Sequence, residues 1–293
     1  MKERPLLTVE DLHVSYQGRS GNVLALRGVS FEVHRERLGI VGESGSGKST
    51  IGLSILRLLP GNARVSARRL DLEGIEILRA SERTMRSIRG RRISMILQDP
   101  KFSLNPVLTV GQQLAESYRV HTHATKSEAN RKALGMLEAV RIRDPERVFS
   151  LYPHEVSGGM GQRVMIAMML IPEPELLIAD EPTSALDVTV QAQLLELIDE
   201  LIQRRRMGLI LISHNMNLVA SFCDRILVLY GGQVMEMLNA ADVSAAQHPY
   251  TQGLLACRPL IERPQSELPQ LKRDPTWLGV PSEIGVAARD RSL

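Results

Sequence analysis

Apolar and polar residues alternate, or apolar residues run together, in short segments that predict a mixed α/β fold. Residues 6–16 and 23–33 alternate like half-buried strands, with a turn between them. Four shorter runs are almost wholly apolar, as in strands of a buried parallel sheet: 37–42, 91–98, 175–180 and 208–213. Residues 224–237 predict a hairpin that turns at Gly231 and Gly232.

Helical patterns occupy the spaces between these strands. A helix is expected from Lys48 to about Leu59, because Pro60 and Gly61 follow and stop helices. Residues 127–140 give the clearest helical pattern, with Ser127 as a candidate N-terminal cap.

The pattern also predicts the domain organisation. The stretch from Gln98 to Pro172 is mostly helical, so we expect a helical subdomain at about 99–172 inserted into one domain that spans 1–256. Prolines become frequent after Ala256 and the periodicity fades, so 257–293 is interpreted as a tail.

Composition narrows the class of protein. The 293 residues are 43% hydrophobic and 24% charged, which is ordinary for a globular protein in water. No apolar run of about 18 residues predicts a membrane span, and the N-terminus lacks the apolar core of a secretion signal. We therefore expect a chain in the cytosol or held at a membrane by partners. The net charge of +3 and 3% aromatic residues argue against nucleic acid as a partner. Cys223 and Cys257 suit a reducing compartment, show no metal-ligand spacing and are expected to be buried.

A glycine-rich loop between an apolar strand and a helix carries the strongest chemical signal. The segment "GESGSGKST" has the spacing of a phosphate-binding loop, whose backbone N–H groups and helix N-terminus hold phosphates. Lys48 is expected to reach the β- and γ-phosphates of ATP, and Ser49 to bind Mg²⁺. The predicted ATP-binding residues of the loop are Gly42, Glu43, Ser44, Gly45, Ser46, Gly47, Lys48, Ser49 and Thr50.

A second segment, "VSGGMGQRV" at 156–164, also has the character of an anion site. Ser157, Gly158 and Gly159 precede an apolar helical run, so small residues with free N–H groups stand at a helix start. One ATP needs only one such loop. The second segment is therefore expected to bind a different anion, or the phosphate of a second ATP site.

Polar side chains follow several of the buried strands, where open parallel sheets bind their ligands. Asp180 ends the run "LLIAD" and is a candidate Mg²⁺ ligand, while Glu181 is placed to activate the attacking water. Taken alone, two adjacent acids at a strand end also suit a solvated loop. Gln98 is a candidate for contact with Mg²⁺ or water, and His214 for the γ-phosphate, although each also suits an ordinary strand-end residue. Tyr16 suits adenine stacking or simple packing in a strand.

These motifs, in this order, resemble the ATP-binding subunit of an ABC transporter over about residues 6–237. The resemblance extends to "SALD" at 184–187, and with "YPHEVSGGMGQRVMIAMML" and "HPYTQGLLA" it narrows to the oligopeptide, dipeptide and nickel importer branch. It implies an α/β fold: a P-loop NTPase core with a mixed parallel sheet, an N-terminal antiparallel β subdomain and a helical subdomain inserted between Gln98 and the "VSGGMGQRV" segment.

The resemblance also answers what the second anion site holds. In such ATPases two subunits pack head to tail, so this segment is expected to contact the γ-phosphate bound by the other subunit. The residues expected to make this contact are Ser157, Gly158, Gly159, Met160 and Gln162. The residues expected to form the dimer loop are Ser184, Ala185, Leu186 and Asp187. Glu181, His214 and Gln98 are expected to be catalytic, and Ser49, Gln98 and Asp180 to hold Mg²⁺.

The family further implies the setting of the chain. The expected partners are a second, different ATP-binding subunit, two permease subunits and, indirectly, a periplasmic solute-binding protein, with this chain peripheral on the cytoplasmic face of the bacterial inner membrane. The segment 99–106 is expected to be a shaped loop leading into the surface that receives a permease helix. The expected function is ATP hydrolysis that powers uptake of a peptide-like solute or nickel.

The sequence departs from the family pattern in three places. Gly161 stands where Arg is usual, Asn215 where Asp is usual, and "HRER" at 34–37 replaces a glycine–glutamate turn. Cys257 is the only cysteine after "HPYT", so no iron–sulfur cluster is expected. The alternatives are a soluble ABC ATPase unconnected with transport, an ATP-gated interaction module and a simple P-loop kinase, which would leave "VSGGMGQRV" unexplained.

Overall fold

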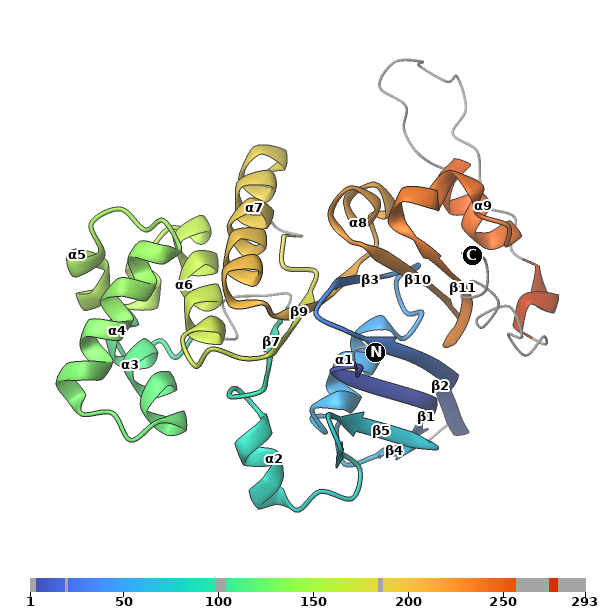
Figure 1. The fold of residues 1–293 in the computed structure, drawn as a ribbon, viewed down its shortest axis with the longest axis horizontal. Coiled ribbons are helices and arrows are strands. Elements are labelled where there is room, and N and C mark those ends of the chain that lie inside the picture. The colour runs from blue at the N-terminus through green and yellow to red at the C-terminus, as the bar shows by residue number, and fades with distance from the viewer. Residues whose placement is uncertain (1–3, 19–20, 98–103, 184–186, 257–273, 279–293) are drawn as a thin grey trace. The chain divides into compact units, whose positions relative to one another are not determined.

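The computed structural model describes residues 4–18, 21–97, 104–183, 187–256 and 274–278, which belong to two compact units. The first unit combines Met1–Arg79 with Ile210–Leu293, and the second is Ala80–Leu209. Figure 1 labels their elements, and each unit is described in turn.

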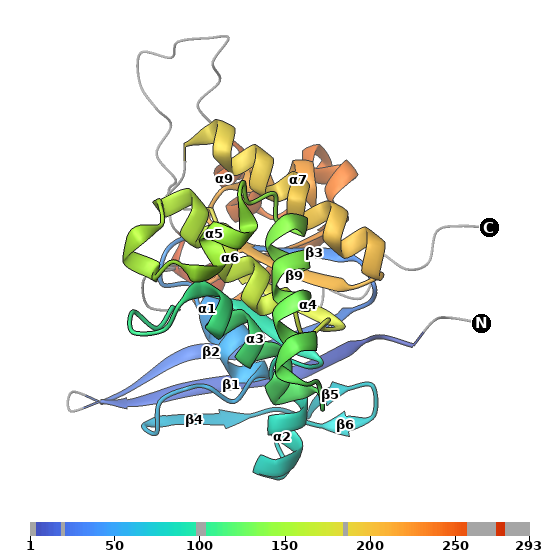
Figure 2. The same ribbon diagram turned by 90° about the vertical axis from the view of Figure 1, so that its left-hand side faces the viewer.

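The first unit contains an antiparallel sheet. Its strands run in the order β2-β1-β5-β6, with β4 paired to β1 (Figure 2). The strands are β1 (Leu7–Gly18), β2 (Gly21–Val33), β4 (Ala63–Ser66), β5 (Arg69–Leu72) and β6 (Ile75–Glu76). The two long strands confirm the predicted antiparallel β subdomain. The other three have four residues or fewer, too short for an alternating pattern to show.

The other sheet of the first unit carries the phosphate-loop strand. Its order is β11-β10-β3-β9, with β10 parallel to β3 and antiparallel to β11. The strands are β3 (Arg37–Val41), β9 (Gly208–Ser213, which begins in the second unit), β10 (Arg225–Tyr230) and β11 (Gln233–Asn239). The predicted hairpin is confirmed, and Gly231 and Gly232 have φ of 52° and 82°, which a tight turn with a right-handed twist requires.

Among the described residues of the first unit, three helices and two 3₁₀ turns accompany this sheet. They are α1 (Lys48–Ile55), α8 (Met216–Phe222), α9 (Pro249–Ala256), η3 (Ala240–Ala245) and η4 (Pro275–Leu278). Helix α8 packs against β3 so closely that a Cβ on Gly39 would run into the side chain of Val219.

Helix α1 begins where predicted but ends four residues earlier than the prediction of Leu59. Arg57 adopts a left-handed conformation, with φ of 51°, immediately after the last turn. The N–H groups of Arg57 and Leu58 then donate to the carbonyls of Ser54 and Leu53 at 3.0 and 2.9 Å. This closing pattern satisfies the last carbonyls and ends the helix before Pro60 is reached.

The second unit pairs two buried strands with six α-helices among its described residues. The strands β7 (Ile93–Ile96) and β8 (Leu176–Asp180) are parallel, as predicted. The helices are α2 (Glu82–Ile88), α3 (Val110–His121), α4 (Lys126–Ala139), α5 (Pro145–Ser150), α6 (Gly158–Leu170) and α7 (Val188–Arg205), with a 3₁₀ turn, η2 (Pro153–Glu155). Helices α3, α4, α5 and α6 pack on one another (Figure 2), and the middle of α6 is buried.

The N-terminal cap of α4 is Thr125, so the prediction of Ser127 is wrong. The Thr125 hydroxyl accepts a hydrogen bond from the Glu128 N–H at 3.3 Å, and the Glu128 carboxylate accepts one from the Thr125 N–H at 2.7 Å. This reciprocal pair satisfies two N–H groups that the first turn leaves without partners, which Ser127 inside the helix does not do.

Ion pairs hold the "HRER" segment, the first departure from the family pattern. Arg37 donates to the Asp224 carboxylate at 2.8 Å, and Glu36 accepts from Arg225 at 2.8 Å. Both partners lie at the start of β10 or just before it, so the unusual turn is fastened to the strand beside β3.

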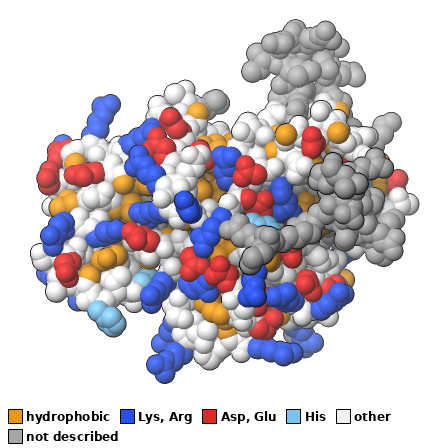
Figure 3. Space-filling model, in the orientation of Figure 1, with side chains coloured by type: hydrophobic (Ala, Val, Ile, Leu, Met, Phe, Trp, Pro, Cys, Tyr) orange, Lys and Arg blue, Asp and Glu red, His pale blue; other side chains and the backbone are white. Residues whose placement is uncertain are grey.

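Charges of both signs are interspersed over the molecular face drawn in Figure 3. In the described part of the chain, no helix is both long and apolar enough to span a bilayer.

Candidate nucleotide-binding site

The phosphate loop lies between the end of β3 and the start of α1 in the first unit. Gly47 is the N-terminal cap residue of α1, with φ of 101°, and it has no side chain with which to cap the helix. A Cβ at this position would also stand 2.7 Å from the Ala25 carbonyl oxygen. The loop therefore needs glycine here, and it leaves the first N–H groups of α1 available to an anion.

Lys48 is buried at the base of this loop. Its side chain is 6% exposed, and its Nζ donates to the carbonyl oxygens of Gly42 and Glu43 at 2.9 and 2.8 Å. Ser46 is also buried, and its Oγ has no hydrogen-bond partner among the described residues. A buried cation and an orphaned hydroxyl beside an uncapped helix fit a phosphate group.

Hydrogen bonds from distant parts of the first unit fix the loop. The Ser46 carbonyl accepts from the Gly232 N–H at 3.0 Å, and the Glu43 N–H donates to the Tyr250 hydroxyl at 3.2 Å. Sequence reasoning missed both contacts. Tyr250 lies 207 residues from Glu43, so no local sequence pattern indicates the bond. The only sequence signal at Tyr250 is the "HPYT" segment, which belongs to the family resemblance.

The other predicted residues of the first unit lie where the sequence places them. Tyr16 is half-buried on β1, opposite Val23 on one side and Ala63 on the other. His214 is exposed directly after β9. Asn215, the second departure, caps α8 by accepting from the N–H groups of the second and third residues after it, at 3.0 and 3.2 Å.

The predicted acids lie at the end of β8 in the second unit. Asp180 is the last residue of the strand and is 7% exposed. Glu181 follows with φ of 46°, a left-handed conformation that is uncommon outside glycine and costs backbone energy. The Gln162 amide donates to the Pro182 carbonyl, so α6 holds the segment that carries this conformation.

The second predicted anion segment forms the start of α6. Ser157 is the N-terminal cap, and its Oγ accepts from the Met160 N–H at 3.4 Å, which leaves the hydroxyl proton for another acceptor. Ser157 and Gly158 are exposed, and a Cβ on Gly158 or Gly159 would meet nothing within 4 Å. The helix start is therefore open, as a contact to a second chain requires.

Gln162 differs from its neighbours in the signature segment. It is only 2% exposed and is directed at Pro182, so its side chain serves its own chain. Next to it, Arg163 donates to the Val140 carbonyl at 3.0 Å, and its pKa is lowered first by burial and then by the nearby Arg141.

Several predicted residues lie outside the described residues: Gln98, Ser184, Ala185, Leu186 and Cys257. Asp187 is described, and its carboxylate caps α7 by accepting from the Thr189 and Val190 N–H groups at 3.1 and 3.0 Å. Within the described ranges, no group of three or more His, Cys, Asp or Glu residues could hold a metal ion. Ser49 belongs to the first unit and Asp180 to the second, so their joint Mg²⁺ site stays a prediction.

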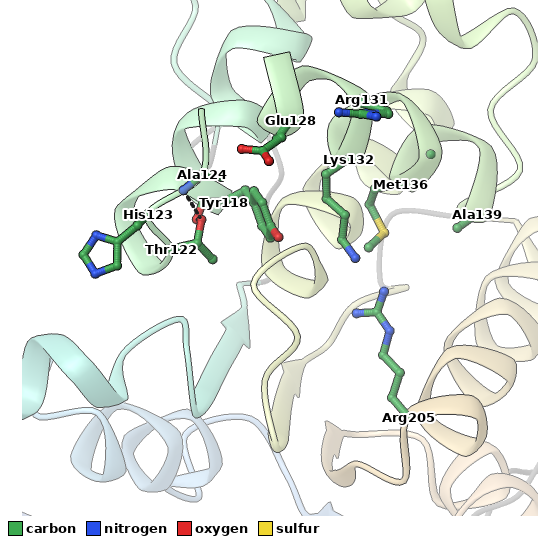
Figure 4. Close-up of a pocket in the computed structure, with 11 residues that line it drawn as sticks. Tyr118, Thr122, His123, Ala124, Glu128, Arg131, Lys132, Met136, Ala139 and Arg205 are labelled. Carbon is green, nitrogen blue, oxygen red and sulfur yellow. Dashed lines mark hydrogen bonds between the residues drawn. The ribbon is translucent and has the colours of Figure 1, made fainter. Parts of the chain in front are cut away.

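A cavity of about 730 Å³ lies between α3, α4 and the end of α7 in the second unit (Figure 4). Lys132 and Arg205 point into it, and Lys132 is paired with Glu173. None of its lining residues belongs to a predicted motif, so the cavity is separate from the candidate site.

The glycine loop, its buried lysine and the uncapped helix that follows a parallel strand define the class of P-loop nucleotide-binding proteins. A family model described as "ABC transporter" matches residues 26–184, and the chain belongs to this family. It is an ATP-binding ATPase of that family.

Curated relatives give the nearer likenesses. A probable peptide ABC transporter ATP-binding protein of Sinorhizobium fredii is 50% identical over 91% of this chain and 81% of its own. A dipeptide transport ATP-binding protein of Bacillus subtilis is 46% identical over 94% and 83%. A glutathione import ATP-binding protein of Escherichia coli is 47% identical, but the match covers 42% of that longer protein.

Solved structures agree with the fold. The dimeric, post-hydrolysis structure of the ATP-binding cassette MJ0796 with ADP and Pi has a TM-score of 0.69 at 25% identity, over 80% of this chain and 98% of that one. A Clostridium perfringens protein that is part of an ABC transporter complex has a TM-score of 0.70 at 26% identity, over 86% and 96%. The predicted fold class is confirmed.

Proposed function

We propose that this chain hydrolyses ATP to power the uptake of a peptide-like solute through membrane permease subunits. The observation that carries the proposal is the 50% identity, over 91% of the chain, to a relative named as a peptide transporter ATP-binding protein. The second relative, named for dipeptide transport, supports the same class of solute.

Each site residue has a role in this proposal. The loop 42–50 binds the phosphates of ATP, with Lys48 as the cation, and Tyr16 stacks on the adenine. Ser49, Asp180 and Gln98 hold Mg²⁺, which neutralises phosphate charge and polarises the γ-phosphate when bound. Their oxygen donors are the kind that Mg²⁺ prefers.

Catalysis is assigned to the residues around the attacking water. Glu181 accepts the proton of this water, and its left-handed backbone fixes the direction from which the carboxylate approaches. His214 contacts the γ-phosphate from its exposed position after β9. Gln98 aids in placing the water.

The second anion segment completes the ATP site of a second ATP-binding subunit, a different paralogue, in a head-to-tail dimer. Ser157, Gly158, Gly159 and Met160 face that subunit's γ-phosphate, and the loop 184–187 lines the dimer interface. The open start of α6 supports this, because no atom would obstruct a Cβ there. Gln162 is buried and bonded to Pro182, which follows Glu181, so its role in this proposal is to position Glu181 rather than to contact the second subunit.

The chain acts at the cytoplasmic face of the inner membrane, with two permease subunits and a periplasmic solute-binding protein beyond them. Residues 1–256 form the nucleotide-binding domain, the helical subdomain covers about 99–172, and 257–293 form a tail. The loop at 99–106 contacts a permease helix and transmits closure of the dimer.

Uptake measurements test the solute class. Cells that lack this chain receive either the wild type or Lys48→Ala, and uptake of labelled dipeptides, glutathione and Ni²⁺ is compared. Dipeptide uptake restored by the wild type alone supports the proposal. Restoration of glutathione or Ni²⁺ uptake only, or of none of the three by an ATPase-active chain, overturns the peptide assignment.

A further inference from the structure

The segment "HPYT" at 248–251 has a structural role that the nucleotide-binding motifs do not explain. Tyr250 is fully buried on α9, and its hydroxyl accepts a hydrogen bond from the N–H of Glu43 at 3.2 Å. Glu43 is the second residue of the phosphate loop and adjoins Gly42, whose carbonyl accepts from Lys48. The bond therefore acts at the point where the chain leaves β3 and turns into the loop.

Residues on both sides of Tyr250 hold its helix in place. The Glu236 carboxylate of β11, itself 8% exposed, accepts from the N–H of Gln247 at 2.7 Å and of His248 at 3.3 Å. The imidazole Nδ1 of His248 then accepts from the N–H of Tyr250 at 3.1 Å. The first two bonds fasten the residues before α9 to β11, and the third ties Tyr250 to His248, so the tyrosine hydroxyl has a fixed position.

Aromatic rings enclose the Tyr250 ring. The ring of Tyr230, at the end of β10, lies 4.6 Å from it between centroids. Trp277 of η4, the single tryptophan of the chain, lies 5.7 Å from the rings of both tyrosines and 5.9 Å from His248. Packing of this kind restricts the ring to one orientation, which a hydrogen bond at its far end requires.

We infer that Tyr250 is a positioning residue for the phosphate loop, held in place by His248, Glu236 and the ring of Trp277. It acts together with the β10–β11 turn, where the Gly232 N–H donates to the Ser46 carbonyl at 3.0 Å. One bond restrains the beginning of the loop and the other its middle. A loop held in its binding conformation pays less entropy when it closes on phosphates, so ATP binds more tightly.

The test uses Tyr250→Phe, which removes the hydroxyl and keeps the ring packing. If the lost hydrogen bond contributes the usual net free energy of such a bond, the KM and Kd for ATP should rise about 3- to 10-fold. The kcat is expected to stay within about twofold of the wild type, because the substitution leaves the proposed catalytic residues unchanged. Tyr230→Phe is the matched control: it removes a hydroxyl from the same cluster, one without a hydrogen bond among the described residues, and its KM should not change.

Two further readouts separate positioning from simple stability. A merely structural role would lower the thermal midpoint and the active fraction, hence the apparent kcat, and leave KM unchanged. Because Trp277 touches Tyr250, its fluorescence is expected to change on ATP binding in the wild type and to change less in Tyr250→Phe. Trp277→Ala should also raise the KM for ATP, as Tyr250→Phe does.

A wild-type KM in Tyr250→Phe overturns the inference, and a wild-type KM in Trp277→Ala alone removes Trp277 from it. The inference rests on residues 42–50 being the ATP-binding loop of this chain. Lys48→Ala tests that assignment separately: unchanged ATP binding by Lys48→Ala overturns the assignment itself, whereas loss in Lys48→Ala with none in Tyr250→Phe overturns only the role of Tyr250.

Discussion

At the scale of single residues, backbone conformation bears on the proposed role of Glu181, and burial controls the reactivity of Cys223. Glu181 combines a half-buried carboxylate with a left-handed backbone at the end of a buried strand, which is the kind of strain found at functional sites. Cys223 is 6% exposed beside α8, and burial raises the pKa of its thiol to about 12. The conformation of Glu181 suits the catalytic role proposed for it, whereas burial makes the Cys223 thiol unreactive.

Replacing Glu181 with Gln should leave ATP binding intact and nearly abolish turnover, because an amide cannot take a proton from the attacking water. General bases typically contribute about 10²- to 10⁴-fold, and a loss of that size is expected in the ATPase rate of the assembled complex. An equilibrium ATP titration supplies the control. A rate within about threefold of the wild type would count against Glu181 as the base.

Cys223 should resist thiol reagents while the protein is folded, because at pH 8 almost none of a thiol with so high a pKa is thiolate. In Cys257→Ser, Cys223 is the only remaining cysteine. Labelling of this variant with an aromatic disulfide reagent should be negligible in buffer and stoichiometric in denaturant. Rapid labelling with an unchanged circular dichroism spectrum would contradict the burial.

At the scale of elements, two helix glycines have opposite surroundings. Gly161 lies inside α6, and a Cβ there would meet only Val156 Cγ2, at 3.8 Å, which is ordinary contact. Gly111 lies in α3, and a Cβ there would run into the ring of Phe149 on α5. Helix α6 therefore has room for a methyl group at Gly161, while α3 has none at Gly111.

Gly161→Ala should stabilise the protein by about 0.5–1 kcal/mol, the usual helix preference for Ala over Gly. Gly111→Ala should destabilise it by about 1–3 kcal/mol, because the added methyl overpacks the contact with Phe149. Denaturant unfolding of the two variants and the wild type gives the comparison. If both substitutions shift the denaturant midpoint in the same direction, that result would contradict the difference in packing described for these two glycines.

At the scale of the whole molecule, the open, exposed start of α6 is accessible to a second chain, as the proposed head-to-tail dimer requires. Ser157 caps its own helix and still has a proton to donate, while Gly158 is exposed. The chain carries its own phosphate loop on the other unit. Two anion-binding helix starts in one chain fit a dimer in which each chain completes its partner's site.

Ser157→Arg should leave ATP binding by the isolated chain unchanged and reduce hydrolysis in the assembled complex. The bulky cation obstructs the facing nucleotide, and the partner's γ-phosphate loses donors that act by charge stabilisation. Ser127→Arg is the matched control, since it places the same side chain at the exposed start of α4. Site-by-site nucleotide trapping should locate the defect at the partner's phosphate loop. Loss of ATP binding by the folded, isolated Ser157→Arg chain would show that the segment serves its own chain.

The sequence by itself determined the features that depend on neighbouring residues. Strand patterns, the glycine turn at Gly231 and Gly232, and the loop that ends in Lys48 are all local, so period and residue type suffice. Local choices between similar groups were harder. Thr125 rather than Ser127 caps α4 because only Thr125 has Glu128 three residues later, and Arg57 ended α1 through a conformation that no residue preference announces.

Only the tertiary structure decided the contacts between distant segments. Tyr250 meets Glu43 because β11, the Glu236 carboxylate and α9 bring the hydroxyl to the end of β3, and none of these steps leaves a periodic pattern. Gln162 likewise turns inward to Pro182, although Ser157 and Gly158 of the same segment are exposed. Residue spacing records which groups can share a turn or a face, whereas burial and long-range hydrogen bonds depend on how the whole chain packs.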